Sequence, residues 1–190
     1  MSCLMKVFTD KWQCRVLLIL ICAVWIPAQA DEWHFSNVER VVAFGDVHGA
    51  YDALVATLQS AGVIDAEARW SGGRTHLVST GDLLDRGAES RRVMDLMMRL
   101  EQEALLAGGR VHQLLGNHEV MKLNGDLRYV ADEEYAAFLD METADERESW
   151  YRHFRERQPE DSDEEALRRE FDKKNPPGFF GHRRALRSDG

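Results

Sequence analysis

The chain has 190 residues, enough for one domain, and its composition, 44% hydrophobic and 30% charged, allows it to bury a core. Its formal net charge of −9 argues against a nucleic-acid-binding surface, which needs a basic patch. All three cysteines lie within the first 22 residues, so any metal site beyond them must be built from His, Asp, Glu and Asn.

The first thirty residues have the pattern of a secretory signal. Basic residues up to Arg15 precede an apolar run over residues 16–26, and Pro27 is followed by Ala-Gln-Ala. These are the three parts of a cleaved signal. The alternative is a membrane anchor, but the run is shorter than the ~20 residues that span a bilayer. We therefore expect residues 1–30 to be a signal peptide, and the mature chain to be periplasmic or secreted, without a stable membrane anchor.

Strand, polar loop and helix alternate through the middle of the chain. The expected elements are a strand over 38–44, a helix around 54–61, a short strand around 77–78 that stops at Gly81, a helix over 90–106 and a strand over 111–115. Such an alternation is typical of an α/β protein with a layered sheet.

The segment over about residues 131–174 differs in composition from the rest. It is rich in acidic residues and arginine, with aromatic residues at helical spacing. We expect two or three amphipathic helices with solvated acidic faces. The alternative is a cap over the functional site. Asn-Pro-Pro-Gly, residues 175–178, ends the helical region, and no strand is expected after it.

Each of the three expected strands ends in a glycine followed by polar side chains. The strings are G-D-x-H-G at 45–49, G-D-x-x-D-R-G at 81–87 and G-N-H-E at 116–119. Loops at the carboxyl ends of strands are where α/β proteins place their chemistry. The residues in these strings that can bind a divalent cation are Asp46, His48, Asp82 and Asn117. Mixed nitrogen and oxygen ligation suits Mn, Fe or Zn.

The second and third loops also carry groups that suit phosphate chemistry. Asp82 could bridge two metal ions, a recurring device for phosphoryl hydrolysis. Arg86 offers a planar fork for a phosphate. His118 is placed to protonate a leaving oxygen, and Asp85, which we expect one helical turn after Asp82, is available to orient that imidazole. The alternative is a turn with solvated charges.

Together, the three motifs resemble those of the calcineurin-like metallophosphoesterases. The string GDLLDRGAES resembles the phosphoprotein phosphatase branch, and LLGNHEVMKLNGDLRYV and PPGFFGHRRA resemble its bacterial Shewanella-like members. The resemblance implies a β-sandwich flanked by helices and two divalent ions (Mn, Fe or Zn). It also implies roles for individual residues: first-metal ligands Asp46, His48 and Asp82, the bridge Asp82, the second-metal ligand Asn117, the general-acid pair His118 and Asp85, and phosphate-binding Arg86.

The chain departs from this family after Asn117. Members complete the second metal with two histidines, one in an H-G-G-like string that this sequence lacks. We therefore expect an incomplete second metal site and the N-terminal half of a longer phosphatase, with only the first half of the fold. The other histidines are expected to be surface or partly buried residues rather than ligands: His34, His76, His112, His153 and His182.

The expected function is hydrolysis of phosphomonoesters by a metal-activated water. The substrate is expected to be a phosphorylated protein, with phosphotyrosine favoured by relatives of this branch. Two alternatives stay open, namely a hydrolase of a small phosphoester such as a dinucleoside polyphosphate and an inactive metal-binding fragment. No nucleic-acid partner is expected.

Overall fold

The computed structural model describes residues 34–186 of the chain. Its contacts define one unit that ends at Asn37 and another that begins at Val38, and every helix and strand described below belongs to the second. The expected signal segment, residues 1–30, lies outside the described residues. Among the residues described, none of the helices combines the length and apolar character that crossing a bilayer requires.

A three-stranded parallel sheet forms the centre of the fold. Its strands are β1 (Val41–Phe44), β2 (His76–Ser79) and β3 (Arg110–Gln113), in the spatial order β1-β2-β3. The last residues of the three strands are aligned with one another. Three loops therefore leave the sheet at the same edge, where parallel α/β sheets place their functional residues.

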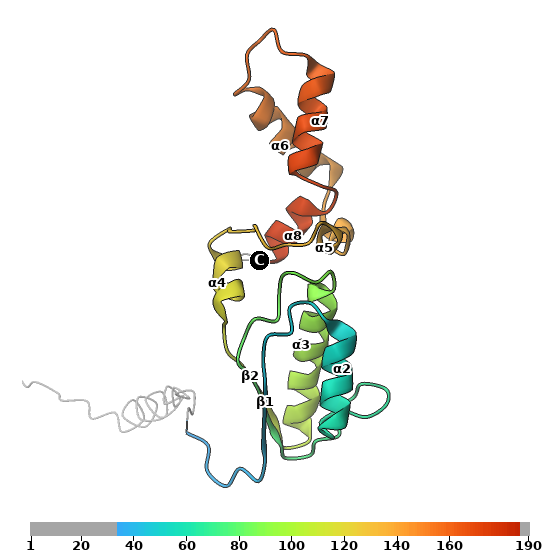
Figure 1. Cartoon of the computed structure of the whole chain (residues 1–190), viewed down its shortest axis with the longest axis vertical. Helices are drawn as coiled ribbons and strands as arrows, with labels where there is room; N and C mark the ends of the chain where they lie inside the picture. Colours follow the sequence, from blue (N-terminus) through green and yellow to red (C-terminus); the bar gives the residue numbers. More distant parts are fainter. Residues whose placement is uncertain (1–33, 187–190) are drawn as a thin grey trace, which may run out of the picture. The chain divides into compact units, whose positions relative to one another are not determined.

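Two helices connect these strands and cover one face of the sheet (Figure 1). They are α2 (Tyr51–Ser60) and α3 (Ser90–Leu106). Their apolar stripes pack on Leu77 and Val111 of the sheet, and Met97 is fully buried in the same core. On the opposite face Val41 is 61% exposed. The expected α/β class is confirmed, and residues 34–186 supply one sheet of the expected sandwich.

The remainder of the described chain is helical. Its elements are α4 (Asn117–Leu123), α5 (Asp132–Ala136), the 3-10 turn η1 (Leu139–Met141), α6 (Ala144–Arg155), α7 (Glu164–Lys174) and α8 (Phe179–Ala185). Helices α6 and α7 pack side by side (Figure 1). Thr143 and Asp163 cap their N-termini by accepting backbone N–H groups at 3.2 and 3.0 Å. Their aromatic faces form a small second core, as the amphipathic pattern predicts, and Phe180 of α8 completes it.

Several element boundaries differ from those expected. The helix over 90–106 is found as predicted, whereas β1 begins at Val41 instead of Val38 and β3 ends at Gln113 instead of Leu115. The apolar runs in the sequence extend beyond the residues that pair in the sheet. Leu115, for example, continues the apolar pattern of β3 but lies outside the strand and is 65% exposed. Helix α8 was not expected at all.

Candidate metal centre

Side chains from two neighbouring loops converge at the carboxyl edge of the sheet. Asp46 and His48 follow β1, and Asp82 follows β2; their ligand atoms all lie within 4.8 Å of one another. Backbone hydrogen bonds join the two loops: the N–H of His48 donates to the carbonyl of Asp82 at 3.0 Å, and that of Gly49 to Leu83 at 2.8 Å. The three side chains expected to hold the first metal ion thus lie together.

The backbone of these loops is held in an unusual conformation. Five non-glycine residues here have positive φ angles, namely Asp46 (54°), His48 (49°), Asp82 (54°), Asp85 (70°) and Arg86 (67°). Left-handed backbone is uncommon for residues that carry a Cβ, and such residues gather at functional sites when the surrounding structure holds them. The finding also corrects one expectation, since a loop rather than a helical turn separates Asp82 from Asp85.

The imidazole of His48 is oriented by the second loop. Its Nδ1 lies 3.1 Å from the carbonyl oxygen of Leu84, which accepts the Nδ1–H. This tautomer leaves the lone pair on Nε2, the atom 3.6 Å from Asp46 Oδ1. An outer hydrogen bond that fixes tautomer and ring orientation is the usual support of a metal-binding histidine. One imidazole nitrogen and two carboxylates therefore fit a divalent ion such as Mn, Fe or Zn.

The glycines of the second and third loops let these loops approach one another closely. A Cβ on Gly116 would lie 2.3 Å from Asp82 Oδ1, and one on Gly81, whose φ is +96°, would lie 2.1 Å from the backbone nitrogen of Gly116. Any larger residue at either position would separate the loops. The close approach also lets Asp82 Oδ1 accept the backbone N–H of His118 at 2.9 Å, which links the ligand to α4.

No role is predicted for Glu119 from the sequence, yet its carboxylate organises the loops. It accepts backbone N–H groups from Asp82 (2.7 Å), Leu83 (2.8 Å), Leu84 (3.3 Å) and Gly116 (2.8 Å). A carboxylate that accepts several backbone donors makes strong, charge-assisted hydrogen bonds. A glutamate three residues after a glycine at a helix start was the available signal, because that spacing places its side chain over the first turn.

His118 and Asp85 form a buried pair beside the ligand group. Nδ1 of His118 lies 2.8 Å from Asp85 Oδ2, and the two side chains are 2% and 0% exposed. The His118 ring meets the His48 ring edge to face, with centroids 4.7 Å apart. A carboxylate at Nδ1 accepts that N–H and leaves Nε2 as the reactive nitrogen. The expected pairing of these two residues is therefore present in the structure.

Arg86 stands at the open side of this pair. Its Nη2 donates to His118 Nε2 at 3.3 Å, and its backbone N–H donates to the carbonyl of Tyr129 at 2.8 Å. Arg86 is an exposed residue, so an incoming anion can reach it. Asn117, exposed at the first position of α4, precedes His118 directly. Its role as a ligand of a second ion stays a prediction.

One of the remaining histidines contradicts the sequence-based expectation. His34 and His153 are exposed and His76 and His112 are partly buried, as expected, but His182 is fully buried. Helix α8 packs against η1, and a Cβ on Gly181 would lie 2.3 Å from the carbonyl oxygen of Phe138. The sequence does not reveal that one face of α8 is buried, because basic residues follow His182 directly. Three further residues around Asp85 were also missed: Ser90, Lys122 and Glu134.

The chain is similar in sequence to known proteins. The family model for calcineurin-like phosphoesterases matches residues 39–182. Shewanella-like protein phosphatase 2 of Arabidopsis thaliana is 41% identical over 109 residues, 56% of this chain and 28% of that protein. A symmetrical bis(5'-nucleosyl)-tetraphosphatase of Cronobacter sakazakii is 35% identical over 111 residues, 57% of this chain and 34% of that protein.

A solved structure is similar over a comparable part of the chain. The crystal structure of a cold-active protein-tyrosine phosphatase from a psychrophilic Shewanella species shares 50% sequence identity, with a TM-score of 0.47, over 48% of this chain and 28% of that one. The chain thus spans about a third or less of the length of these relatives.

Proposed function

The chain belongs to the calcineurin-like phosphoesterase family, and from this we propose that the protein is a metal-dependent phosphomonoester hydrolase that acts on phosphorylated proteins. One observation carries the proposal: the buried His118–Asp85 pair lies directly against the ring of His48, one of three grouped metal-ligating side chains. A proton donor next to a metal group is the arrangement that hydrolysis of a phosphoester requires.

Asp46, His48 and Asp82 would hold one divalent ion, and we propose Asn117 and Asp82 for a second. When bound, such ions neutralise phosphate charge and acidify a water molecule. Oδ1 of Asp82 also accepts the backbone N–H of His118, so this residue would tie α4 to the metal group. Manganese, iron and zinc all match the donor set.

The protein's own side chains supply the remaining steps. Arg86 donates to Nε2 of His118, so this nitrogen carries a lone pair in the absence of substrate. A phosphate offers the guanidinium a stronger, charge-assisted pair of hydrogen bonds, and Arg86 would turn to it. Nε2 is then free to take up a proton and deliver it to the leaving oxygen, while Asp85 holds the Nδ1–H.

The surroundings of the site favour an aromatic phosphoester carried on a protein. Asp46, Arg86 and Asn117 are all exposed, so a phosphorylated side chain on a protein surface could reach them. Tyr129 is 45% exposed, and its ring centroid lies 5.3 Å from that of His118. An aromatic ring at this distance offers a stacking surface to a phosphotyrosine side chain.

The test is release of phosphate by the chain in excess manganese, because the second ion would have only Asp82 and Asn117 as ligands and would be held weakly. We expect turnover of a phosphotyrosine peptide to exceed that of a phosphoserine peptide and of a dinucleoside tetraphosphate. Asp82→Asn should abolish turnover of all three, which excludes a contaminating phosphatase. Metal uptake without turnover of any substrate would contradict the proposal, and preference for the dinucleotide would assign the protein to small-molecule hydrolysis.

A further inference from the structure

Beneath the His118–Asp85 pair lies a group of polar side chains that the proposed reaction does not use. This buried cluster consists of Ser90 on α3, Lys122 on α4, Glu134 on α5 and His182 on α8, which all contact Asp85 or one another. Each of the four residues is at most 5% exposed. Polar groups that are buried so deeply are expensive unless they are paired, so the arrangement calls for an explanation.

Lys122 makes the direct contact with the catalytic pair. Its Nζ lies 2.6 Å from Asp85 Oδ1, whereas the other carboxylate oxygen, Oδ2, faces His118 Nδ1 at 2.8 Å. Oδ2 is therefore hydrogen-bonded to His118, whereas Oδ1 faces the Lys122 ammonium in an ion pair that lacks hydrogen-bond geometry. The two contacts on opposite oxygens favour one orientation of the carboxylate. The contact of Oδ2 with His118 selects the tautomer, because a carboxylate oxygen that accepts the Nδ1–H leaves Nε2 without a proton.

Glu134 joins the other members of the buried cluster. Its Oε1 lies 3.3 Å from Lys122 Nζ and 2.9 Å from His182 Nε2, and its Oε2 accepts the hydroxyl of Ser90 at 2.8 Å. The Ser90 hydroxyl in turn accepts the backbone N–H of Asp85 at 3.2 Å. Glu134 is thus connected to both the side chain and the backbone of Asp85.

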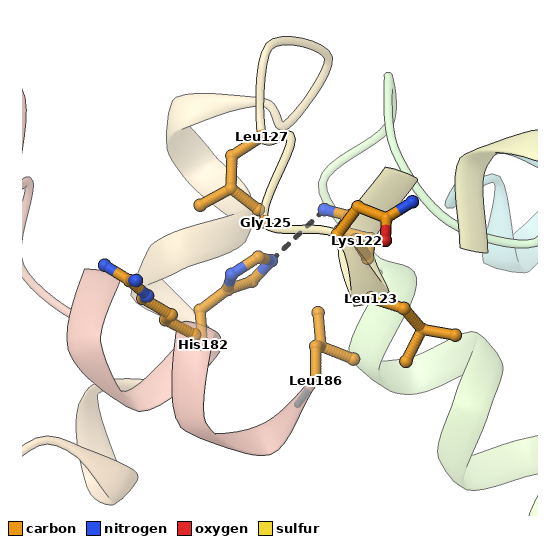
Figure 2. A pocket seen from close by; sticks show the side chains of 8 residues that line it. Lys122, Leu123, Gly125, Leu127, His182 and Leu186 are labelled. Carbon is orange, nitrogen blue, oxygen red and sulfur yellow. Dashed lines mark hydrogen bonds between the residues drawn. The ribbon is translucent and has the colours of Figure 1, made fainter. Parts of the chain in front are cut away.

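The buried cluster extends this connection to the last described helix. Figure 2 shows Lys122 of α4 and His182 of α8 pointing toward one another, with Nζ and Nε2 3.3 Å apart. The shorter contact of His182 Nε2 is the one to Glu134, which therefore accepts its N–H. Helices α5 and α8, which come from segments far along the chain, in this way contact the residues that hold Asp85.

We propose that Lys122 and Glu134 are positioning residues of the His118–Asp85 pair: Lys122 fixes the Asp85 carboxylate, and Glu134 fixes Lys122. The catalytic consequence rests on the proposed function, whereas the effect on the hydrogen bond between His118 and Asp85 does not. Without Lys122, Asp85 Oδ1 loses its ion-pair partner and the carboxylate is free to rotate away from His118. An imidazole held in the wrong tautomer or orientation loses its ability to transfer a proton.

The first test is spectroscopic and needs no activity. In zinc-loaded protein with ¹⁵N-labelled histidine, the proton between His118 Nδ1 and Asp85 should give a downfield resonance, identified by its loss in His118→Gln. Lys122→Met should shift or broaden this resonance, and Glu134→Gln, which keeps the shape of the side chain, should shift it less. Lys174→Met, which removes an exposed pair with Glu170, is the matched control. An unchanged resonance in both cluster variants would overturn the proposal.

The second test separates positioning from simple charge balance. We expect Lys122→Met to lower kcat on phenyl phosphate by ~10- to 100-fold and to leave KM unchanged. A loss of this size is usual when a residue that supports a functional side chain is removed. On nitrophenyl phosphate, which needs little protonation, the loss should be smaller. The double variant Lys122→Met/Glu134→Gln removes one positive and one negative charge, which helps the chain to fold. It should stay impaired if Lys122 positions Asp85, whereas recovery of wild-type kcat would mean that Lys122 only balances Glu134.

The two tests also keep this proposal apart from the proposed function. If the wild-type chain hydrolyses no phosphoester, the proposed function fails, but the resonance of the Nδ1 proton still decides whether Lys122 fixes Asp85. If the wild-type chain is active and Lys122→Met matches it in kcat on both substrates, the positioning role fails and the proposed function stands.

Discussion

Replacing Glu119 with glutamine should disrupt the metal loops, although it changes only one end of the side chain. The glutamate carboxylate accepts four backbone N–H groups, two on each oxygen: Leu83 and Leu84 on Oε1, Asp82 and Gly116 on Oε2. A glutamine amide has one oxygen and one NH₂ group. In Glu119→Gln, the NH₂ group must therefore face two backbone donors, and those two hydrogen bonds are lost.

The expected cost follows from these two bonds. A hydrogen bond to a charged group contributes ~1.5–3 kcal/mol, and a donor left unpaired adds to the loss. Because Glu119 is only partly buried, we take the lower end and expect Glu119→Gln to lower the free energy of unfolding by about 3 kcal/mol. The affinity for manganese should also fall, since Asp82 belongs to the loop that is released.

Urea unfolding of the purified chain, followed by circular dichroism, measures the change in stability, and a manganese titration measures the change in affinity. Glu101→Gln is the control, because Glu101 is an exposed glutamate on α3 and its loss should change the free energy of unfolding by less than ~0.5 kcal/mol. If Glu119→Gln and Glu101→Gln unfold at the same urea concentration and bind manganese equally, Glu119 does not organise the loops.

Three further predictions use the same protein. His118→Ala should slow turnover of a poor leaving group by ~10²- to 10⁴-fold, with Asp85→Asn showing a smaller loss of the same kind, and a loss that is equal for good and poor leaving groups would refute the general-acid role. Elemental analysis after manganese loading should find one tightly held ion per chain, and Asp82→Asn should lose it; two tightly held ions would show that the second site is already complete. Burial and nearby positive charge lower the pKa of His76 and of His112 in the folded chain below the ordinary value of 6.5. The unfolded chain therefore binds protons at a higher pH than the folded chain, and the stability should fall as the pH drops below about 6.5. In the double variant His76→Gln/His112→Gln, the urea midpoint should change less between pH 7.5 and 5.5 than in the wild-type chain. An equal change in both proteins would mean that other groups cause the pH dependence.

Local sequence was enough to predict which side chains of the metal-ligating type come together. Asp46, His48 and Asp82 follow apolar runs that form parallel strands, and the ends of such strands meet at one edge of a sheet. Alternation of strand and helix predicted the α/β class, and the helix over 90–106 was predicted to the residue because its apolar stripe is long and periodic. These signals are read from neighbours along the chain, so no folded structure is needed to detect them.

Tertiary structure decided which residues hold these loops and the His118–Asp85 pair in place. Glu119 and Lys122 look like ordinary charges at the start and end of a short helix, and the sequence places His182 among basic residues near the end of the chain. Packing turns all three toward the loops or the buried cluster, where carboxylates and backbone N–H groups from other elements face them. The identity of a buried polar partner depends on which segments meet in space, because pairing in the core is set by packing rather than by sequence spacing.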